Sequence, residues 1–283
     1  AISNFFSGVL EKESESKNVT SSIVTRSYER ISNLKYGCNP HQKPAAIYRP
    51  LGKSAPFDVV NGTPGYINML DAMNAWGLVR ELRQALNMPA AASFKHCSPA
   101  GAAVGCPLTI NEAAAYEVAD PSILTSTALA YVRARNADPM CSFGDFAAVS
   151  DIVDVNTAKY FKTTVCDGII APGFEPEALE ILKSKKKGAF VCLQASPDYN
   201  APIQEFREFY GLVFSQRRND KIFTAEDLKQ MVAGDAFPEA AVRDLVLASI
   251  SIKYTQSNSV GYALNGQMIG VGAGQQSRVD CVK

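Results

Sequence analysis

Histidine, paired cysteines and long apolar runs are all scarce in this sequence, and each scarcity disfavours a class of protein. The 283 residues contain only two histidines, His41 and His96. The seven cysteines are scattered, odd in number and without a C-x-x-C pair, which favours reduced thiols over a disulfide framework or a zinc cluster. No apolar run reaches the roughly 18 residues that span a bilayer, and the first residues lack a signal-peptide pattern. We therefore expect a cytoplasmic protein with no membrane partner.

The charge balance gives no overall basic field. Lys and Arg together number 28, and Asp and Glu together also number 28. This balance argues against nucleic acid as the main partner, because nucleic-acid binding depends on a surplus of cationic side chains. With 47% hydrophobic and 20% charged residues, the composition is typical of a soluble globular protein. A chain of this length can bury a substantial core, as one large domain or as two lobes.

Apolar runs alternate with helical patterns along most of the chain, which predicts an α/β fold. The runs that we expect to form strands lie at 45–48, 57–60, 90–94, within 142–150, at 169–171, 189–193 and 210–215. The patterns that we expect to form helices lie at 67–86, 112–135 with a break near 120, 156–161, 175–187, 224–228 and 238–253. The basic run 185–187 is expected to cap its own helix. Asn265-Gly266 between two alternating runs is a strong hairpin signal.

The stretch 89–105 combines ionisable and small residues. After the apolar run 90–94 come Lys95 and His96, and Ser98-Pro99 then offers an N-cap followed by proline at a first helical position. We therefore expect a helix to begin there, with its N-terminus able to hold an anion beside a base. From chemistry alone, a Lys-His pair after an apolar run is more often a surface turn than a catalytic site, so both interpretations stay open.

Two turn-rich segments carry further polar side chains. Residues 34–44 either line a site or form a surface connection. Gly270, Gly272 and Gly274 match a dinucleotide-binding motif only weakly, because the sixth position is glutamine and no strand–helix–strand unit precedes them. Arg278, which follows these glycines, either grips a phosphate or carboxylate with two hydrogen bonds or is a surface residue.

Six sequence motifs, in order along the chain, closely resemble one known domain. They are Lys35-Tyr-Gly-Cys-Asn-Pro-His-Gln, Ala91-Ala-Ser-Phe-Lys-His-Cys-Ser-Pro-Ala-Gly-Ala-Ala-Val-Gly, Ser142-Phe-Gly-Asp-Phe, Asp167-Gly-Ile-Ile-Ala-Pro-Gly, Lys253-Tyr-Thr-Gln-Ser-Asn-Ser and Gly272-Ala-Gly-Gln-Gln-Ser-Arg. The domain is the AICAR transformylase of the bifunctional purine-biosynthesis family that also carries IMP cyclohydrolase. The opening Ala1-Ile-Ser-Asn-Phe-Phe is similar to the point where the family's cyclohydrolase part ends. The resemblance therefore covers the first and larger part of the transformylase, without the cyclohydrolase.

The resemblance implies a fold of two related cytidine-deaminase-like lobes, each a three-layer α/β/α arrangement without a metal. The H-x-E and P-C-x-x-C signatures of zinc deaminases are missing from the sequence. Residues 1–34 would be a linker or peripheral segment and 35–195 the first lobe. Residues 196–239 would connect the lobes, and 240–283 would begin an incomplete second lobe. Family members are homodimers with active sites shared between subunits, so we expect the same here.

The activity that the resemblance implies is formyl transfer in de novo purine biosynthesis, the route to IMP. The formyl group would pass from 10-formyltetrahydrofolate to the 5-amino group of AICAR, giving FAICAR, without a metal. His96 would be the general base for the amine proton. Lys95 would stabilise the oxyanion that develops on the formyl group. The alternative is a nucleotide-binding module, or an inactive fragment, that keeps the fold and the AICAR contacts. A metal deaminase is disfavoured by the missing ligands.

The resemblance also implies substrate contacts beyond the cationic pair. Those expected to contact AICAR, together with His96, are Lys35, Tyr36, Gly144, Asp167, Asn258 and Arg278. Phe143 lies beside Gly144 in the same loop, and Val279 occupies a position that contacts folate in the family. The sequence departs from the family at Lys35, where Arg is common, so a two-bond phosphate grip becomes a point charge. It also departs at Cys97, which replaces a usual Val as a small apolar residue.

Overall fold

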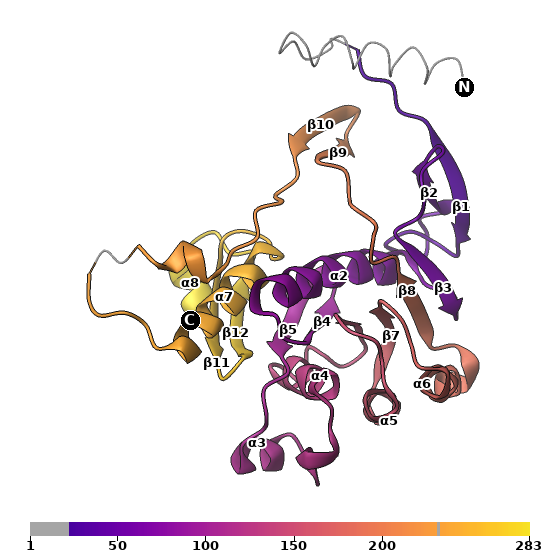
Figure 1. The fold of residues 1–283 in the computed structure, drawn as a ribbon. Helices are drawn as coiled ribbons and strands as arrows, with labels where there is room; N and C mark the ends of the chain where they lie inside the picture. Colours follow the sequence, from indigo (N-terminus) through magenta and orange to yellow (C-terminus); the bar gives the residue numbers. More distant parts are fainter. Residues whose placement is uncertain (1–22, 231–232) are drawn as a thin grey trace. The chain divides into compact units, whose positions relative to one another are not determined.

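The computed structural model describes residues 23–230 and 233–283 (Figure 1). The chain divides into two units, Ala1–Ala55 and Pro56–Lys283. In the first, β1 (Tyr28–Leu34) pairs antiparallel with β2 (Ala45–Pro50). The strand expected at 45–48 is confirmed. Of the expected peripheral segment 1–34, residues 1–22 lie outside the described residues.

The second unit is built on a mixed sheet of eight strands in the order β11-β12-β5-β4-β6-β7-β8-β3 (Figure 1). Their bounds are β3 (Phe57–Asn61), β4 (Ala90–Lys95), β5 (Ser98–Val104), β6 (Asp145–Val149), β7 (Cys166–Ala171), β8 (Val191–Ala195), β11 (Ser259–Leu264) and β12 (Gln267–Ala273). Strands β6, β7 and β8 run parallel to one another, and the other pairings are antiparallel. A separate hairpin joins β9 (Gln204–Phe209) to β10 (Leu212–Arg217).

Helices cover both faces of this sheet, so the unit has three layers (Figure 1). On one face lie α2 (Tyr66–Leu86) and α7 (Glu239–Lys253), which pack against each other. The opposite face carries α4 (Ser126–Asn136), α5 (Val155–Thr163) and α6 (Pro176–Lys183). Shorter helices are α3 (Ile110–Ala115), η1 (Pro121–Ile123), η2 (Lys185–Gly188), η3 (Ala225–Leu228) and α8 (Arg278–Val282). The predicted α/β class is confirmed, whereas the cytidine-deaminase-like relation and the boundaries at 35, 195 and 240 stay predictions.

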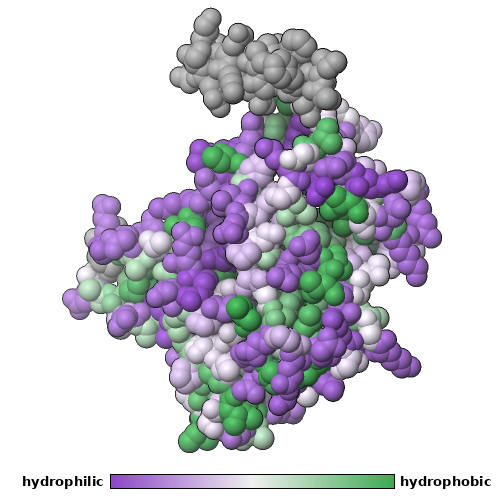
Figure 2. Space-filling model, turned by 45° about the vertical axis from the view of Figure 1, so that its right-hand side comes forward, coloured by the Kyte–Doolittle hydropathy of each residue, from purple (hydrophilic) through white to green (hydrophobic). Residues whose placement is uncertain are grey.

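Small residues in the central strands allow the layers to approach closely. The alanines of β4 and β6 are fully buried, and so are the facing aromatic residues Tyr131 and Phe161 of α4 and α5. At Gly101 of β5, a Cβ would stand 2.1 Å from the carbonyl oxygen of Ala134, so only glycine fits between strand and helix. Burial of these apolar surfaces is the main favourable term for the fold. Apolar residues also reach the surface, in several separate patches on the face shown in Figure 2.

The helix expected to begin at Ser98-Pro99 is absent, because those residues begin strand β5. His96 and Cys97 have positive φ values of 53° and 63°, so they form a two-residue turn that returns the chain antiparallel to β4. Pro99 pairs with Phe94, next to the irregularity in β4 between Ser93 and Phe94, a place where a strand tolerates a missing N–H. The buried pairings of β5 with β4 and β12 outweigh the local capping signal.

Two other expectations have different outcomes. The hairpin at Asn265-Gly266 is confirmed, because these residues join β11 to β12. The basic run 185–187 does not cap its own helix. Instead, the ammonium of Lys185 donates to the carbonyls of Phe161 and Thr164, at the end of α5. Lys185 therefore stabilises the C-terminal end of the neighbouring helix, where the helix dipole is negative.

Candidate functional site

Most of the predicted site residues lie at one end of the eight-stranded sheet. Because β4 runs antiparallel to β6, and β6 parallel to β7, the end of β4 at Lys95 meets the beginnings of β6 and β7. Gly144 and Asp167 are at those beginnings. By the same reasoning β12 ends and β11 begins at this end, which brings Asn258 and Arg278 to it. One end of the sheet therefore collects candidates that are far apart in the sequence.

The closest contact among them joins Lys95 to the loop before β6. Lys95 is half-buried, and its ammonium donates to the carbonyl oxygen of Phe143 over 2.6 Å. The next residue, Gly144, has φ +77°, and no described atom outside residues 143–145 lies within 4 Å of the place where its Cβ would stand. The side chain of Phe143 is 60% exposed. A cation, an open glycine backbone and an exposed ring thus stand together, an arrangement suited to a flat, polar ligand.

A buried cluster of polar side chains packs against the loop that carries Phe143 and Gly144. The carboxylate of Asp145 lies 2.7 Å from the Ser93 hydroxyl and accepts from the Arg135 guanidinium over 3.0 Å. Arg135 also donates to the carbonyl oxygen of Ser142. Burial raises the pKa of Asp145 to about 6, and the Ser93 and Arg135 contacts oppose that rise. The loop that carries Phe143 and Gly144 is therefore held from both of its ends.

His96 is exposed on the turn between β4 and β5, over the buried Asp71 of α2. The backbone N–H of Cys97 donates to Oδ1 of Asp71 over 2.6 Å. Burial raises the pKa of Asp71, whereas the turn's backbone N–H groups and the charge of His96 lower it. The turn thus exposes the imidazole of His96 to solvent and directs the backbone N–H of Cys97 toward Asp71.

A cavity of about 800 Å³ opens beside His96. It is lined from α2 by Met73 and Glu81, and from the end of α7 by Lys253. Arg207 and Arg218, from and just after the β9–β10 hairpin, also line it. Its cationic side chains outnumber its acidic ones, so the cavity favours an anionic ligand group.

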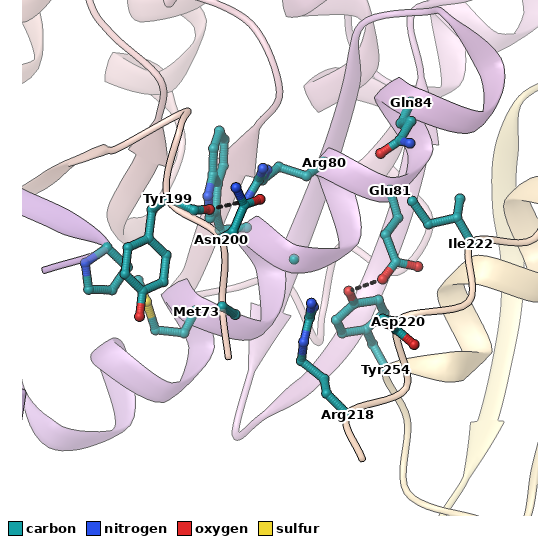
Figure 3. Close-up of a pocket in the computed structure, with 14 residues that line it drawn as sticks. Met73, Arg80, Glu81, Gln84, Tyr199, Asn200, Arg218, Asp220, Ile222 and Tyr254 are labelled. Atoms are coloured by element: carbon teal, nitrogen blue, oxygen red, sulfur yellow. Dashed lines mark hydrogen bonds between the residues drawn. The ribbon is translucent and has the colours of Figure 1, made fainter. Parts of the chain in front are cut away.

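An adjoining cavity of about 470 Å³ shares Glu81 and Arg218 with the first (Figure 3). Glu81 accepts from the ammonium of Lys253 over 2.8 Å and from the hydroxyl of Tyr254 over 2.8 Å. Figure 3 shows the hydrogen bond between Tyr254 and Glu81. It also shows Arg80, which precedes Glu81 in α2, directed toward the backbone carbonyl of Tyr199. Burial, followed by the Glu81 charge, raises the pKa of Tyr254, so its hydroxyl stays a donor. These bonds fix the wall between α2 and α7.

The remaining candidates have partners of their own. Asp167 pairs with Lys186 over 2.5 Å. The Asn258 side-chain amide donates to the carbonyls of Gln275 and Gln276, and so holds the segment that leads to Arg278. Arg278 and Val279 are exposed at the start of α8.

The structure therefore brings some predicted residues into contact and leaves others apart. Lys95 contacts Phe143, and Gly144 adjoins it, whereas β11, which follows Asn258, is three strand positions from β4, or about 14 Å at the usual strand spacing. Lys35 and Tyr36 belong to the first unit, directly after β1. Among the described residues, no group of three or more His, Cys, Asp or Glu is placed to hold a metal. No helix in the described ranges is long and apolar enough to cross a membrane.

Sequence reasoning missed the residues that support the site from within. Asp71 lies between Leu70 and Ala72 inside the apolar pattern of α2, and a lone carboxylate in such a position signals a buried acceptor. Asp145 is the first residue of the fully buried strand β6, so it too is a lone carboxylate in an apolar run and signals a buried acceptor. Arg207 and Arg218 gave none, because their approach to His96 depends on the path of residues 196–220.

Comparison with known proteins gives consistent matches. A family model described as "AICARFT/IMPCHase bienzyme" matches residues 1–283. The bifunctional purine biosynthesis protein PurH of Halalkalibacterium halodurans is 33% identical over 265 residues, covering 92% of this chain and 47% of that protein. PurH of Oceanobacillus iheyensis is 30% identical over 283 residues, covering 98% of this chain and 49% of that protein. The chain thus spans about half the length of the curated relatives it matches.

Proposed function

The chain belongs to the AICARFT/IMPCHase bienzyme family, and we propose that it catalyses the formyl transfer of purine biosynthesis. The donor is 10-formyltetrahydrofolate, the acceptor is the 5-amino group of AICAR, and the product is FAICAR. The single observation that carries the proposal is the pair Lys95 and His96 at the end of β4, with Lys95 bonded to the loop of Phe143 and Gly144.

The chemistry of the acceptor explains why such a pair is needed. The AICAR amine is conjugated to an imidazole ring that carries a carboxamide, so it is a weak nucleophile and its proton must leave as it attacks. A neutral His96 takes that proton, directly or through the carboxamide. The Lys95 ammonium stabilises the negative charge that develops on the formyl oxygen in the tetrahedral intermediate. The amine nitrogen forms a bond to the formyl carbon, and the N10 of tetrahydrofolate leaves with a proton.

The other candidates supply the binding contacts in this proposal. The open backbone at Gly144 lets the AICAR ring approach, and Phe143 and Val279 offer exposed apolar surface to folate. Those that bind the polar and charged groups of AICAR are Lys35, Tyr36, Asp167, Asn258 and Arg278. Arg278, as a guanidinium, suits a phosphate or carboxylate.

We further propose a homodimer in which one active site takes residues from two copies of the chain. The resemblance to the AICAR transformylase family, whose members share active sites between subunits, supports this proposal. The two lobes are proposed to be cytidine-deaminase-like, and the reaction to need no metal. The seven cysteines are scattered along the sequence, odd in number and without a C-x-x-C pair, which supports a reducing cytoplasmic location.

The test is tetrahydrofolate formation by this chain with AICAR and 10-formyltetrahydrofolate. We expect Lys95→Ala and His96→Ala each to lower kcat by roughly 10²- to 10⁴-fold. Lys159→Ala, on the exposed side of α5, is the matched control and keeps wild-type turnover. Saturable AICAR binding without any turnover would replace the transferase with a nucleotide-binding module. Full turnover in both site variants would remove the assigned roles.

A further inference from the structure

Two buried aspartates hold two tight turns of the second unit in the same way. Asp71 is the sixth residue of α2, and Asp244 is the sixth residue of α7. Each helix is followed along the chain by a hairpin, β4–β5 after α2 and β11–β12 after α7. Both carboxylates are almost fully buried, with 4% and 7% of each residue exposed.

The contacts of the two aspartates correspond. Asp244 accepts from the backbone N–H groups of Asn265 and Gly266, each over 2.8 Å. Asp71 accepts from the N–H of Cys97 over 2.6 Å. In each case a helix carboxylate accepts from the backbone N–H of the second turn residue, Cys97 or Gly266, since a buried donor without an acceptor is costly.

The two turns differ in the residues that form them. All four residues have positive φ, between 53° and 73°. Asn-Gly is the pair that such turns favour, because asparagine tolerates this conformation and glycine has no Cβ. Cys97 stands where the other turn has Gly266, and it carries a Cβ at φ 63°. Backbone strain of this kind is characteristic of functional sites and needs support from the surrounding structure.

We propose that Asp71 is a positioning residue whose carboxylate holds the His96–Cys97 turn in its left-handed conformation and presents a negative charge to His96. The direction of the imidazole, and its readiness to take the amine proton, then depend on a residue that does not contact substrate. This role in transfer rests on the proposed function, whereas the hold on the turn does not.

The charges that face Asp71 are known from the structure. Burial makes the largest contribution to the pKa of Asp71 and raises it. The charge of His96 lowers that pKa, and the charge of Asp167 raises it. Asparagine at position 71 removes the charge but keeps an oxygen that accepts from Cys97. Alanine removes both. The pair of substitutions therefore separates the acceptor from the charge.

The first test needs no substrate. Amide hydrogen exchange by NMR compares Cys97 with Gly266 in the wild type and in Asp71→Asn, Asp71→Ala and Asp244→Ala. Asp71→Ala is expected to speed exchange at Cys97 about tenfold without changing Gly266, and Asp244→Ala to do the reverse. Asp71→Asn is expected to stay near the wild type at both amides. Unchanged exchange at Cys97 in Asp71→Ala overturns the proposal.

The second test measures how the charge of Asp71 affects turnover. In Asp71→Asn the pH profile of kcat/KM is expected to change, because the negative charge that faces the imidazole of His96 is removed. The KM for AICAR is expected to change by less than about threefold. Asp244→Asn, the same substitution in the other helix, keeps the wild-type profile. A profile of Asp71→Asn identical to the wild type overturns the electrostatic role. If the wild-type chain shows no transfer, the proposed function fails, and amide exchange still decides whether Asp71 holds the turn.

Discussion

The ammonium of Lys95 and the carbonyl oxygen of Phe143 are joined by a hydrogen bond of 2.6 Å. The bond links the end of β4 to the loop that precedes β6, so the cation has a fixed place before any substrate arrives. A charge that is already oriented stabilises a developing oxyanion without further reorganisation. Lys95 in turn supplies the loop with a hydrogen-bond donor for the carbonyl of Phe143.

Replacing Lys95 by Met should lower kcat for tetrahydrofolate formation by about 10²-fold or more, because the oxyanion loses its only proposed cation. Lys95→Arg keeps the charge and should retain part of the activity. Steady-state kinetics at saturating AICAR measures both. Lys159→Met controls for loss of a lysine elsewhere, and a Met variant with normal kcat would contradict the role of Lys95.

Gly144→Ala should weaken AICAR binding, because a Cβ would occupy the open space that we assign to the substrate. Its φ of +77° also disfavours any Cβ, so unfolding free energy should fall by about 1–2 kcal/mol. Gly188→Ala is the matched control, with φ +90° and equally open surroundings. Urea unfolding should show similar losses in both variants, and only Gly144→Ala should raise the KM for AICAR. Equal KM values in the two variants would count against a substrate at Gly144.

Asp167→Asn should raise the KM for AICAR by about tenfold, because a charged acceptor for the substrate becomes neutral. Lys186→Gln should leave that KM unchanged or lower it, since Lys186 occupies Asp167 in the absence of substrate. Neither change should cost much stability, because both side chains are more than a third exposed. Isothermal calorimetry with AICAR distinguishes the two variants. A larger loss of affinity in Lys186→Gln would assign the binding role to the lysine instead.

Glu112 should stabilise the fold at neutral pH and lose that effect in acid. Hydrogen bonds from Arg133 and Thr109 lower the pKa of Glu112 to about 2 from its ordinary 4.5. A lowered pKa gives stability that is present above about pH 4.5 and lost as pH falls toward 2. Relative to Glu112→Gln, the wild type should be more stable by about 2–3 kcal/mol near pH 7 and by less than half of that near pH 3. Urea unfolding at both pH values measures the difference, and a constant difference would contradict the assignment.

The elements with strong local signals were predictable from the sequence. The helix expected at 67–86 is α2, with bounds one residue wider, because its apolar residues recur at helical spacing around a buried face. The β11–β12 hairpin followed from Asn265-Gly266. The hairpin of β9 and β10 was seen only as a single strand, because its turn residues, Tyr210 and Gly211, lack the Asn-Gly signal.

The site itself was only partly predictable. The family motifs located Lys95 and His96, but the helix expected after them was wrong because a local N-cap signal carries no information on sheet pairing. Pairing of β5 with β12 depends on Gln267 meeting Ala103, far along the chain. The buried partner of the turn, Asp71, likewise becomes visible only when α2 lies on the sheet. The sequence thus supplied the proposed reactive side chains and missed the buried groups that we propose orient them.

The order of the strands has a consequence for how the protein folds. Both flanks of the sheet join segments from distant parts of the chain, β3 with β8 and β12 with β5. Closing long loops is slow and costs entropy before any contact forms, whereas the β4–β5 hairpin needs only His96 and Cys97 to turn back. We therefore expect the turn that carries the proposed base to form early, and the cavity beside it to close last, when α7 docks onto α2.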